Sequence, residues 1–247
     1  MTKFLAIASA KGGVGKTTAA INVGAALVNF GKDVVVVDAN LSKPNISICL
    51  GTPKLSYTLH DALAGKLHVT DAAYLHPSGL RVIPGSMSIN ALKNITDLIG
   101  NLKNVVNGLA GSTHLVMLDT GAGLGKETLA ALEASDEVII VTTPDAPSVA
   151  DALKTIKMAE EIGCGVLGVV VNKASGDRYE MSEKNIEAML EKNILGIVAD
   201  DISVKKSVAA RQPLVYLYPD APASIGFKKI AAQLMGQEYM HSLTKNF

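Results

Sequence analysis

The sequence has few cysteines, no net charge and no long hydrophobic run. Its 247 residues include two cysteines, Cys49 and Cys164, which lie far apart and outside any C-x-x-C motif. This spacing predicts neither a disulfide framework nor an iron–sulfur or zinc site, so we expect two buried thiols in a reducing cytosol. Lys plus Arg and Asp plus Glu both number 23. The formal net charge is therefore zero, and no long-range field attracts the protein to nucleic acid or anionic lipid.

Metal and membrane signals are also scarce. The five histidines include no pair at i, i+3 or i, i+4, the spacing that a helical metal site needs. No apolar run approaches the roughly 18 residues of a membrane span. The opening "MTKFLAIASA" imitates a secretion signal, but its apolar part, 4–10, is short and serves better as a strand. We expect a cytoplasmic protein.

Six short runs rich in Val, Ile and Leu predict buried strands. None shows the alternation of a strand with one wet face, which indicates strands covered by helices on both sides. The runs are "FLAIA" (4–8), "VVVV" (34–37), "HLVML" (114–118), "EVIIV" (137–141), "VLGVVV" (166–171) and "LGIV" (195–198).

Helical patterns separate these runs. One follows residue 15 and ends near Gly31. Thr58-x-x-Asp61 is typical of a capping box that opens a helix ending at Gly65, and Ser148-x-x-Asp151 predicts a second helix start. Further candidates are 182–192 and 224–236. Strands alternating with helices predict an α/β fold with a doubly wound, mainly parallel sheet. We expect one domain over 1–247, with a loose tail from about 237.

Polar residues follow nearly every predicted strand. Asp38, Asp119 and Asn172 each come directly after one, as do the pairs 142–143 and 200–201. Ligands of open parallel sheets bind outside the carboxyl ends of the strands. The candidate chemistry therefore gathers at one edge.

The stretch "SAKGGVGKTT" (9–18) carries the strongest functional signal. Its glycines let backbone N–H groups point at an anion, and the following helix adds its positive end. Lys16 is placed to reach the β- and γ-phosphates, the Thr17 hydroxyl to bind Mg²⁺, and Asp119 to hold the water around that ion. We expect a nucleotide with Mg²⁺ at this loop, and the family resemblance described next implies that the nucleotide is ATP. The predicted cradle consists of Gly12, Gly13, Val14, Gly15, Lys16, Thr17 and Thr18.

The general motif G-x-x-x-x-G-K-[ST] fails here because Ala10 takes the place of its first glycine. The loop K-G-G-V-G-K-T-T instead resembles the deviant Walker A loop of the MinD/ParA family of P-loop ATPases, and archaeal MinD-like proteins are the most similar group. Six further segments continue the resemblance in order: "VVVVDANLSKPNISICLG" (34–51), "TLHDALAGK" (58–66), "LDTGAG" (118–123), "VTTPDAPSVADALK" (141–154), "GVVVNK" (168–173) and "YPDAPAS" (218–224).

The resemblance implies roles for single residues. Lys11 corresponds to the family's signature lysine, which crosses a dimer interface to the phosphates of the other subunit, where a second cation stabilises the transferring group. The protein would then be a switch, dimeric with ATP and monomeric with ADP. Asn172 would read the adenine, with Asp201 nearby. Asp38 would join the metal site, and the catalytic group would comprise Lys11, Lys16, Asp38 and Asn40.

Two positions depart from the family pattern. Switch I of the family usually carries D-x-D, and the resemblance implies that the second acid orients the attacking water. In this chain Asn40 takes the place of that acid. An amide bonds water but carries no charge and takes no proton. We therefore expect slow hydrolysis that Asn40→Asp would raise. Gly121 replaces the switch II proline and adds backbone freedom.

The sequence favours a MinD-like ATPase that recruits an unidentified protein partner and acts in spatial organisation, such as placement of the division site. A ParA-like DNA partition ATPase is less favoured because of the zero net charge. A metallocluster carrier lacks the paired cysteines, and a scaffold with negligible hydrolysis stays open because of Asn40. Met240, Leu243 and Phe247 could share one helical face, but one lysine in 236–247 gives weak support for peripheral membrane binding.

Overall fold

One eight-stranded sheet organises the chain. The computed structural model describes residues 1–52, 56–88 and 95–239, and the strand order is β3-β4-β2-β5-β1-β6-β7-β8. Strands β3 and β4 run antiparallel, and the other neighbouring pairs run parallel. The strands are β1 (Lys3–Ser9), β2 (Val34–Ala39), β3 (Tyr74–Leu75), β4 (Arg81–Ile83), β5 (Leu115–Ala122), β6 (Glu137–Thr142), β7 (Gly165–Ala174) and β8 (Ile194–Ala199).

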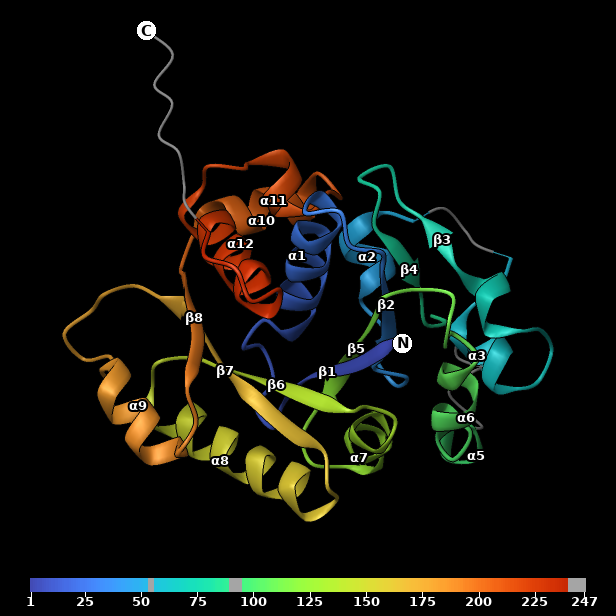
Figure 1. Ribbon diagram of the computed structural model, residues 1–247, viewed down its shortest axis with the longest axis horizontal. Helices are drawn as coiled ribbons and strands as arrows, with labels where there is room; N and C mark the ends of the chain where they lie inside the picture. The colour runs from blue at the N-terminus through green and yellow to red at the C-terminus, as the bar shows by residue number, and fades with distance from the viewer. Residues whose placement is uncertain (53–55, 89–94, 240–247) are drawn as a thin grey trace, which may run out of the picture.

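Helices cover both faces of the sheet (Figure 1). Helices α1 (Lys16–Asn29) and α12 (Pro222–Leu234) lie on one face, with α10 (Ile202–Ala209) and α11 (Leu214–Leu217) beside them. The opposite face carries α7 (Lys126–Glu133), α8 (Ala146–Glu161) and α9 (Glu183–Leu190). Short elements complete the fold: α2 (Ile46–Leu50), α3 (Leu59–Leu63), a 3-10 turn (Val69–Ala72), α5 (Ile95–Ile99) and α6 (Leu102–Asn107).

The central strands are apolar because both their faces are covered. Every residue of β2 is buried, and so is every residue of β1 after Lys3. Side chains of β2 alternate between the two layers: Val36 packs in the core under α1, whereas Val35 and Val37 pack in the core on the opposite face. The predicted doubly wound parallel sheet is therefore confirmed.

The structure corrects three predictions. Helix α8 begins before Ser148: its N-cap is Asp145, which accepts a hydrogen bond from Ser148 N at 3.0 Å. Strands β3 and β4 were not predicted, because two- and three-residue strands leave too short an apolar run. Cys164 is buried, but Cys49 is only half-buried. Burial raises the pKa of each thiol to about 11.

Other local predictions are confirmed. Thr58 and Asp61 form the expected capping box at the start of α3, and Gly65 follows that helix with a φ of 73°. In the part of the chain described here, no helix has the length and apolar character needed to cross a bilayer. The suggested apolar face of Met240, Leu243 and Phe247 lies outside the described residues.

Candidate functional site

A large cavity opens at the carboxyl edge of the parallel strands. Its volume is about 1030 Å³, enough for a nucleotide. Helices α1, α7 and α10 begin at its walls, so three positive helix ends face this region. The predicted site residues that line it are Gly12, Gly13, Gly15, Lys16, Thr17, Thr18, Asn40, Asn172 and Asp201. Lys11, Val14, Asp38 and Asp119 do not belong to the lining.

The glycine loop has the backbone shape that an anion cradle requires. Gly13 and Gly15 have φ values of 79° and 98°, in the left-handed region that favours glycine. A Cβ on Gly15 would also collide with the side chain of Asn172. Asn172 donates from Nδ2 to the carbonyl oxygen of Val14 at 2.7 Å. The loop is thus fastened to the end of β7, and Val14 is buried beneath it.

Lys16 and Thr17 form the first turn of α1. Lys16 is 7% exposed, and its Nζ lies 3.5 Å from the carbonyl oxygen of Lys11. Burial lowers the pKa of Lys16, although the nearby Asp119 opposes this shift. A buried ammonium group with so weak a partner is well placed to bind an anion in the loop. The Thr17 hydroxyl donates to Asp119 Oδ2 at 2.6 Å.

Two buried carboxylates lie side by side below the cavity. Asp38 and Asp119 are opposite each other in the register of β2 and β5, and both are 0% exposed. Each has one oxygen, Oδ1, without a hydrogen-bond partner among the described residues. Burial raises the pKa of Asp119 to about 7, and burial together with the charge of Asp119 raises that of Asp38 well above its usual range.

This carboxylate pair fits the Mg²⁺ predicted from the sequence. Two buried carboxylates are costly unless a cation or a proton compensates them. Hard oxygen donors are what Mg²⁺ takes, often through the water molecules it retains. The free Oδ1 atoms of Asp38 and Asp119, beside the Thr17 hydroxyl, provide such donors.

Lys11 makes its contacts within its own chain. Its Nζ lies 3.1 Å from Asp145 Oδ1 and 2.6 Å from Ser148 Oγ, at the N-terminus of α8. The side chains of Lys11 and Asp145 are 39% and 45% exposed. Hydrogen bonds from Thr143, Ser148 and Lys11 outweigh desolvation and hold the pKa of the Asp145 carboxyl far below its usual range.

Asp201 has a different setting from Asn172. Its Oδ1 accepts from Ser203 N at 2.8 Å as the N-cap of α10, and its Oδ2 accepts from Ala223 N at 3.2 Å. These contacts join α10 to α12. Asp201 lines the cavity, yet its carboxylate is already used by the backbone, which makes it a structural residue of the wall.

Sequence reasoning missed four polar side chains at this edge. Lys173 donates to the carbonyl oxygen of Gly13 at 2.7 Å, and Asp145 and Ser148 hold Lys11. Glu127 of α7 lines the cavity and accepts hydrogen bonds from Ser42. Lys173 and Asp145 lie just beyond predicted strands and within the family-like segments 168–173 and 141–154, but neither signal indicated their contacts. Nothing near Glu127 in sequence indicated its contact with the loop after β2.

Comparison with known proteins extends these observations. The ParA family profile, described as an NUBPL iron-transfer P-loop NTPase, matches residues 1–235. An uncharacterized ATP-binding protein of Methanocaldococcus jannaschii is 39% identical over 245 residues, covering 99% of this chain and 92% of that protein. The antiactivator FleN of Pseudomonas aeruginosa is 28% identical, covering 94% of this chain and 86% of its own.

A solved structure has the same architecture. The septum site-determining protein MinD from Pyrococcus horikoshii, complexed with Mg-ADP, superposes with a TM-score of 0.90 at 27% identity, covering 95% of this chain and 96% of that chain. The sheet order, the glycine loop and the profile match agree with one another. This chain belongs to the ParA family of P-loop NTPases and has a MinD-like structure.

Proposed function

We propose that this protein is a slow ATPase that works as a switch, in which ATP joins two copies and hydrolysis separates them. The single observation that carries this proposal is the position of Lys11. The loop between Gly12 and Thr17 already has a cation, the buried Lys16, which lines the cavity where the phosphates would bind. Lys11 lies at the mouth of the loop, half-exposed and turned away toward α8.

Release of Lys11 would cost little. An ion pair as exposed as Lys11 with Asp145 contributes about 0–1 kcal/mol. The triphosphate of a second copy, by contrast, offers Lys11 several negative charges in a partly dehydrated interface. We therefore infer that Lys11 rests on Asp145 in the single chain and contacts the other copy's phosphates in the ATP-bound pair.

The residues below the cavity support ATP with Mg²⁺ as the cofactors. Thr17, Asp38 and Asp119 would hold the ion or its water, and Lys16 would neutralise the β- and γ-phosphates. Asn172 would contact the adenine through its amide oxygen, since Nδ2 is committed to Val14. The remaining cradle would be backbone N–H groups of the glycine loop.

We infer that the ATP-bound pair recruits a protein partner in a process of spatial organisation. The relatives are named for different roles, an antiactivator in one case and a septum site-determining protein in another. We propose the ATP-dependent switch for this chain, with division-site or other placement as its theme. We propose action in the cytoplasm, with peripheral membrane contact as the weaker alternative.

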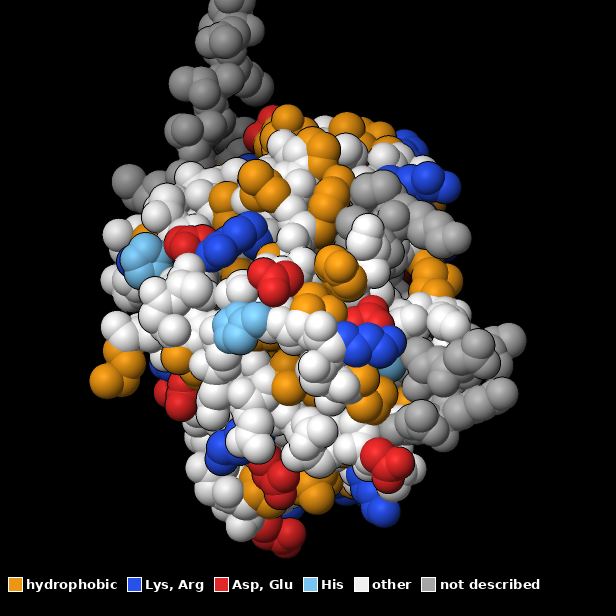
Figure 2. Space-filling view, turned by 90° about the vertical axis from the view of Figure 1, so that its right-hand side faces the viewer, with side chains coloured by type: hydrophobic (Ala, Val, Ile, Leu, Met, Phe, Trp, Pro, Cys, Tyr) orange, Lys and Arg blue, Asp and Glu red, His pale blue; other side chains and the backbone are white. Residues whose placement is uncertain are grey.

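DNA partition is the competing function. Non-specific DNA binding depends on neutralising phosphates with Lys and Arg. The chain has no net charge, and the face shown in Figure 2 has basic and acidic side chains interspersed. Sedimentation with DNA and ATP at rising salt tests this alternative, and we expect no ATP-dependent DNA binding.

Sizing in solution tests the switch. We expect the wild type to be monomeric alone and with ADP, and dimeric with ATP and Mg²⁺. Lys11→Ala should still bind nucleotide, because Lys16 and the loop are intact, but should remain monomeric. Lys173→Ala serves as a matched control, since Lys173 is a lysine of β7 that contacts the loop by donating to Gly13 of its own chain. Equal dimerisation of Lys11→Ala and wild type would contradict the proposed role of Lys11.

A further inference from the structure

Three features at the cavity and just below it bear on one question, namely which group orients the water that attacks ATP. Asn40 lines the cavity at the end of β2 but has no charge to offer. Asp38 and Asp119 are fully buried and face each other in the predicted metal site. A carboxylate that does line the cavity, together with Asn40, belongs to Glu127 of α7.

Glu127 is held toward the segment that follows β2. Its Oε2 accepts a hydrogen bond from Ser42 N at 3.2 Å, and its Oε1 accepts from the Ser42 hydroxyl. Ser42 and Glu127 are 85 residues apart in sequence. The side chain is half-buried, so it keeps access to the cavity while these two bonds fix its direction.

Gly121 brings Asn40 and Glu127 close together. The position that a Cβ of residue 121 would take lies 3.2 Å from Asn40 Oδ1 and 3.5 Å from Glu127 Oε2. A side chain there would crowd both oxygens. Because Gly121 has no side chain, the Asn40 amide and the Glu127 carboxylate can both be directed at the same small region of the wall.

We propose that Glu127 is a catalytic residue that supplies the carboxylate missing at position 40. This inference rests on the proposed ATPase function. The carboxylate accepts a hydrogen bond from the attacking water, and the Asn40 amide helps to orient it. The water oxygen bonds to the γ-phosphorus while the bond from that phosphorus to the β,γ-bridging oxygen breaks, and its electron pair leaves on ADP. The water's proton passes to Glu127 and then to the released phosphate.

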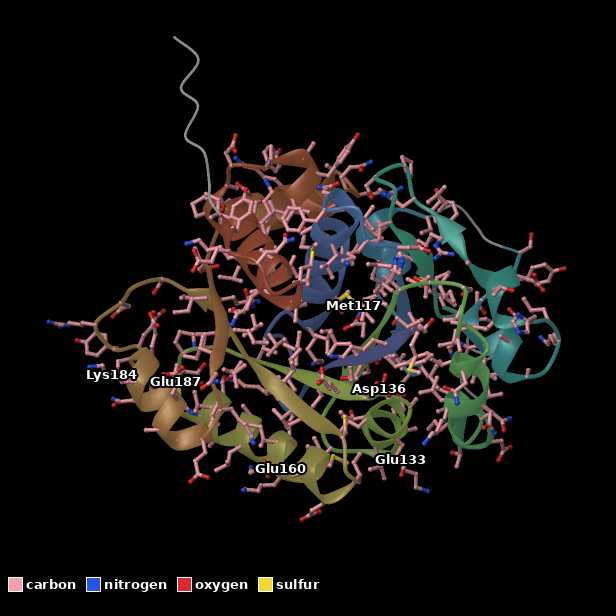
Figure 3. All side chains as sticks on the ribbon, in the orientation of Figure 1. Met117, Glu133, Asp136, Glu160, Lys184 and Glu187 are labelled. Carbon is pink, nitrogen blue, oxygen red and sulfur yellow. The ribbon has the colours of Figure 1, made fainter. Side chains whose placement is uncertain are left out.

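The first test is Glu127→Gln in the full-length protein, measured by phosphate release with ATP and Mg²⁺. Glutamine has nearly the same shape, and its amide oxygen still accepts from Ser42 N, but it takes no proton. We expect turnover to fall at least about tenfold, with unchanged affinity for a fluorescent ATP analogue. The matched control is Glu133→Gln at the exposed end of the same helix, labelled in Figure 3, which should leave turnover unchanged.

The second test restores a carboxylate elsewhere. We expect Asn40→Asp to raise turnover in the wild type, and in the Glu127→Gln background it should recover most of the lost rate. Rescue distinguishes a chemical role from a structural one, because an acid at position 40 does not repair the contact with Ser42. Ser42→Ala, which retains the carboxylate and loses one of its partners, should slow turnover less than Glu127→Gln.

Two results would overturn the inference. One is an unchanged rate in Glu127→Gln while the wild type hydrolyses ATP. The other is a loss of turnover in Ser42→Ala as large as in Glu127→Gln, together with no rescue by Asn40→Asp. That result would mean that Glu127 has only a structural role, holding the segment that contains Ser42. A wild type that binds ATP and releases no phosphate would instead refute the proposed hydrolysis itself, so the two failures are separable.

Discussion

At the scale of the residue, the adjacent buried carboxylates of Asp38 and Asp119 carry an electrostatic cost, because burial disfavours their charged forms. Asp38 Oδ2 is stabilised by Asn45 N at 2.9 Å and Ile46 N at 3.0 Å, but its Oδ1 has no partner. Because both folded-state pKa values are raised, the folded protein binds more protons than the unfolded chain. The stabilisation that comes from these extra bound protons is complete below about pH 4. It is lost as the pH rises through about 7, where the carboxyl groups of the folded protein become charged.

Asp38→Asn tests this cost. Without metal or nucleotide, we expect the variant to be more stable than the wild type at pH 8, by roughly 1–3 kcal/mol, because one of two adjacent charges is removed. The difference should shrink as the pH falls toward 4. Urea unfolding in EDTA across this range measures it.

Mg²⁺ with ATP should reverse the order of the two proteins, because a bound cation compensates both carboxylates of the wild type. Asp97→Asn on α5 is the control, since Asp97 is exposed and its loss should not change the pH dependence. A variant less stable than the wild type at every pH in EDTA would show that no charge repulsion exists between the two positions.

At the scale of the element, α12 approaches β8 so closely that only glycine fits. A Cβ on Gly226 would lie 2.8 Å from the carbonyl oxygen of Ile197 and 3.1 Å from Val198 Cα. These are backbone atoms, which cannot turn away as the end of a side chain can. The contact brings the start of α12 beside α10, where Ala223 N bonds Asp201 in the cavity wall.

Gly226→Ala should therefore destabilise the protein by about 1–3 kcal/mol, although alanine is the better helix former by about 1 kcal/mol. In the variant, the free-energy cost of the steric clash is larger than the gain in helix propensity, because α12 would have to move away from the sheet. Chemical unfolding measures the change. Gly100→Ala is the control: among the described residues, the one atom near its Cβ would be Asp97 O, at 3.9 Å, and we expect little effect. A neutral or stabilising Gly226→Ala would refute the close packing.

At the scale of the whole molecule, the cavity collects residues from the two ends of the sequence and from both layers of helices. Nucleotide binding should therefore stabilise the entire fold. We expect ATP with Mg²⁺ at about 100 times the dissociation constant to add about 2.7 kcal/mol, which is roughly 5–10 °C in unfolding temperature.

Thermal unfolding with and without Mg²⁺ checks this expectation. Lys16→Ala removes the buried cation of the loop and should abolish most of the shift, while Lys173→Ala should retain it. An equal shift in wild type and Lys16→Ala would mean that the nucleotide binds elsewhere.

The sequence by itself determined the parts that depend on local pattern. Runs such as "VVVV" at 34–37 predicted strands buried on both faces, and the chain's polar residues after these runs predicted the edge where the cavity lies. The glycine loop needed no tertiary knowledge, because positive φ values and a following helix are encoded within ten residues.

Only the tertiary structure decided which distant groups meet. Lys11 and Asp145 are 134 residues apart, and Ser42 and Glu127 are 85 residues apart, with nothing near either in sequence to indicate the contact. Such pairs form because sheet order places the ends of β1, β2, β5 and β6 together, and sheet order follows from packing both faces of the whole chain. A local sequence pattern does not indicate the order of the strands, because the energy that decides this order comes from burial between residues far apart in sequence.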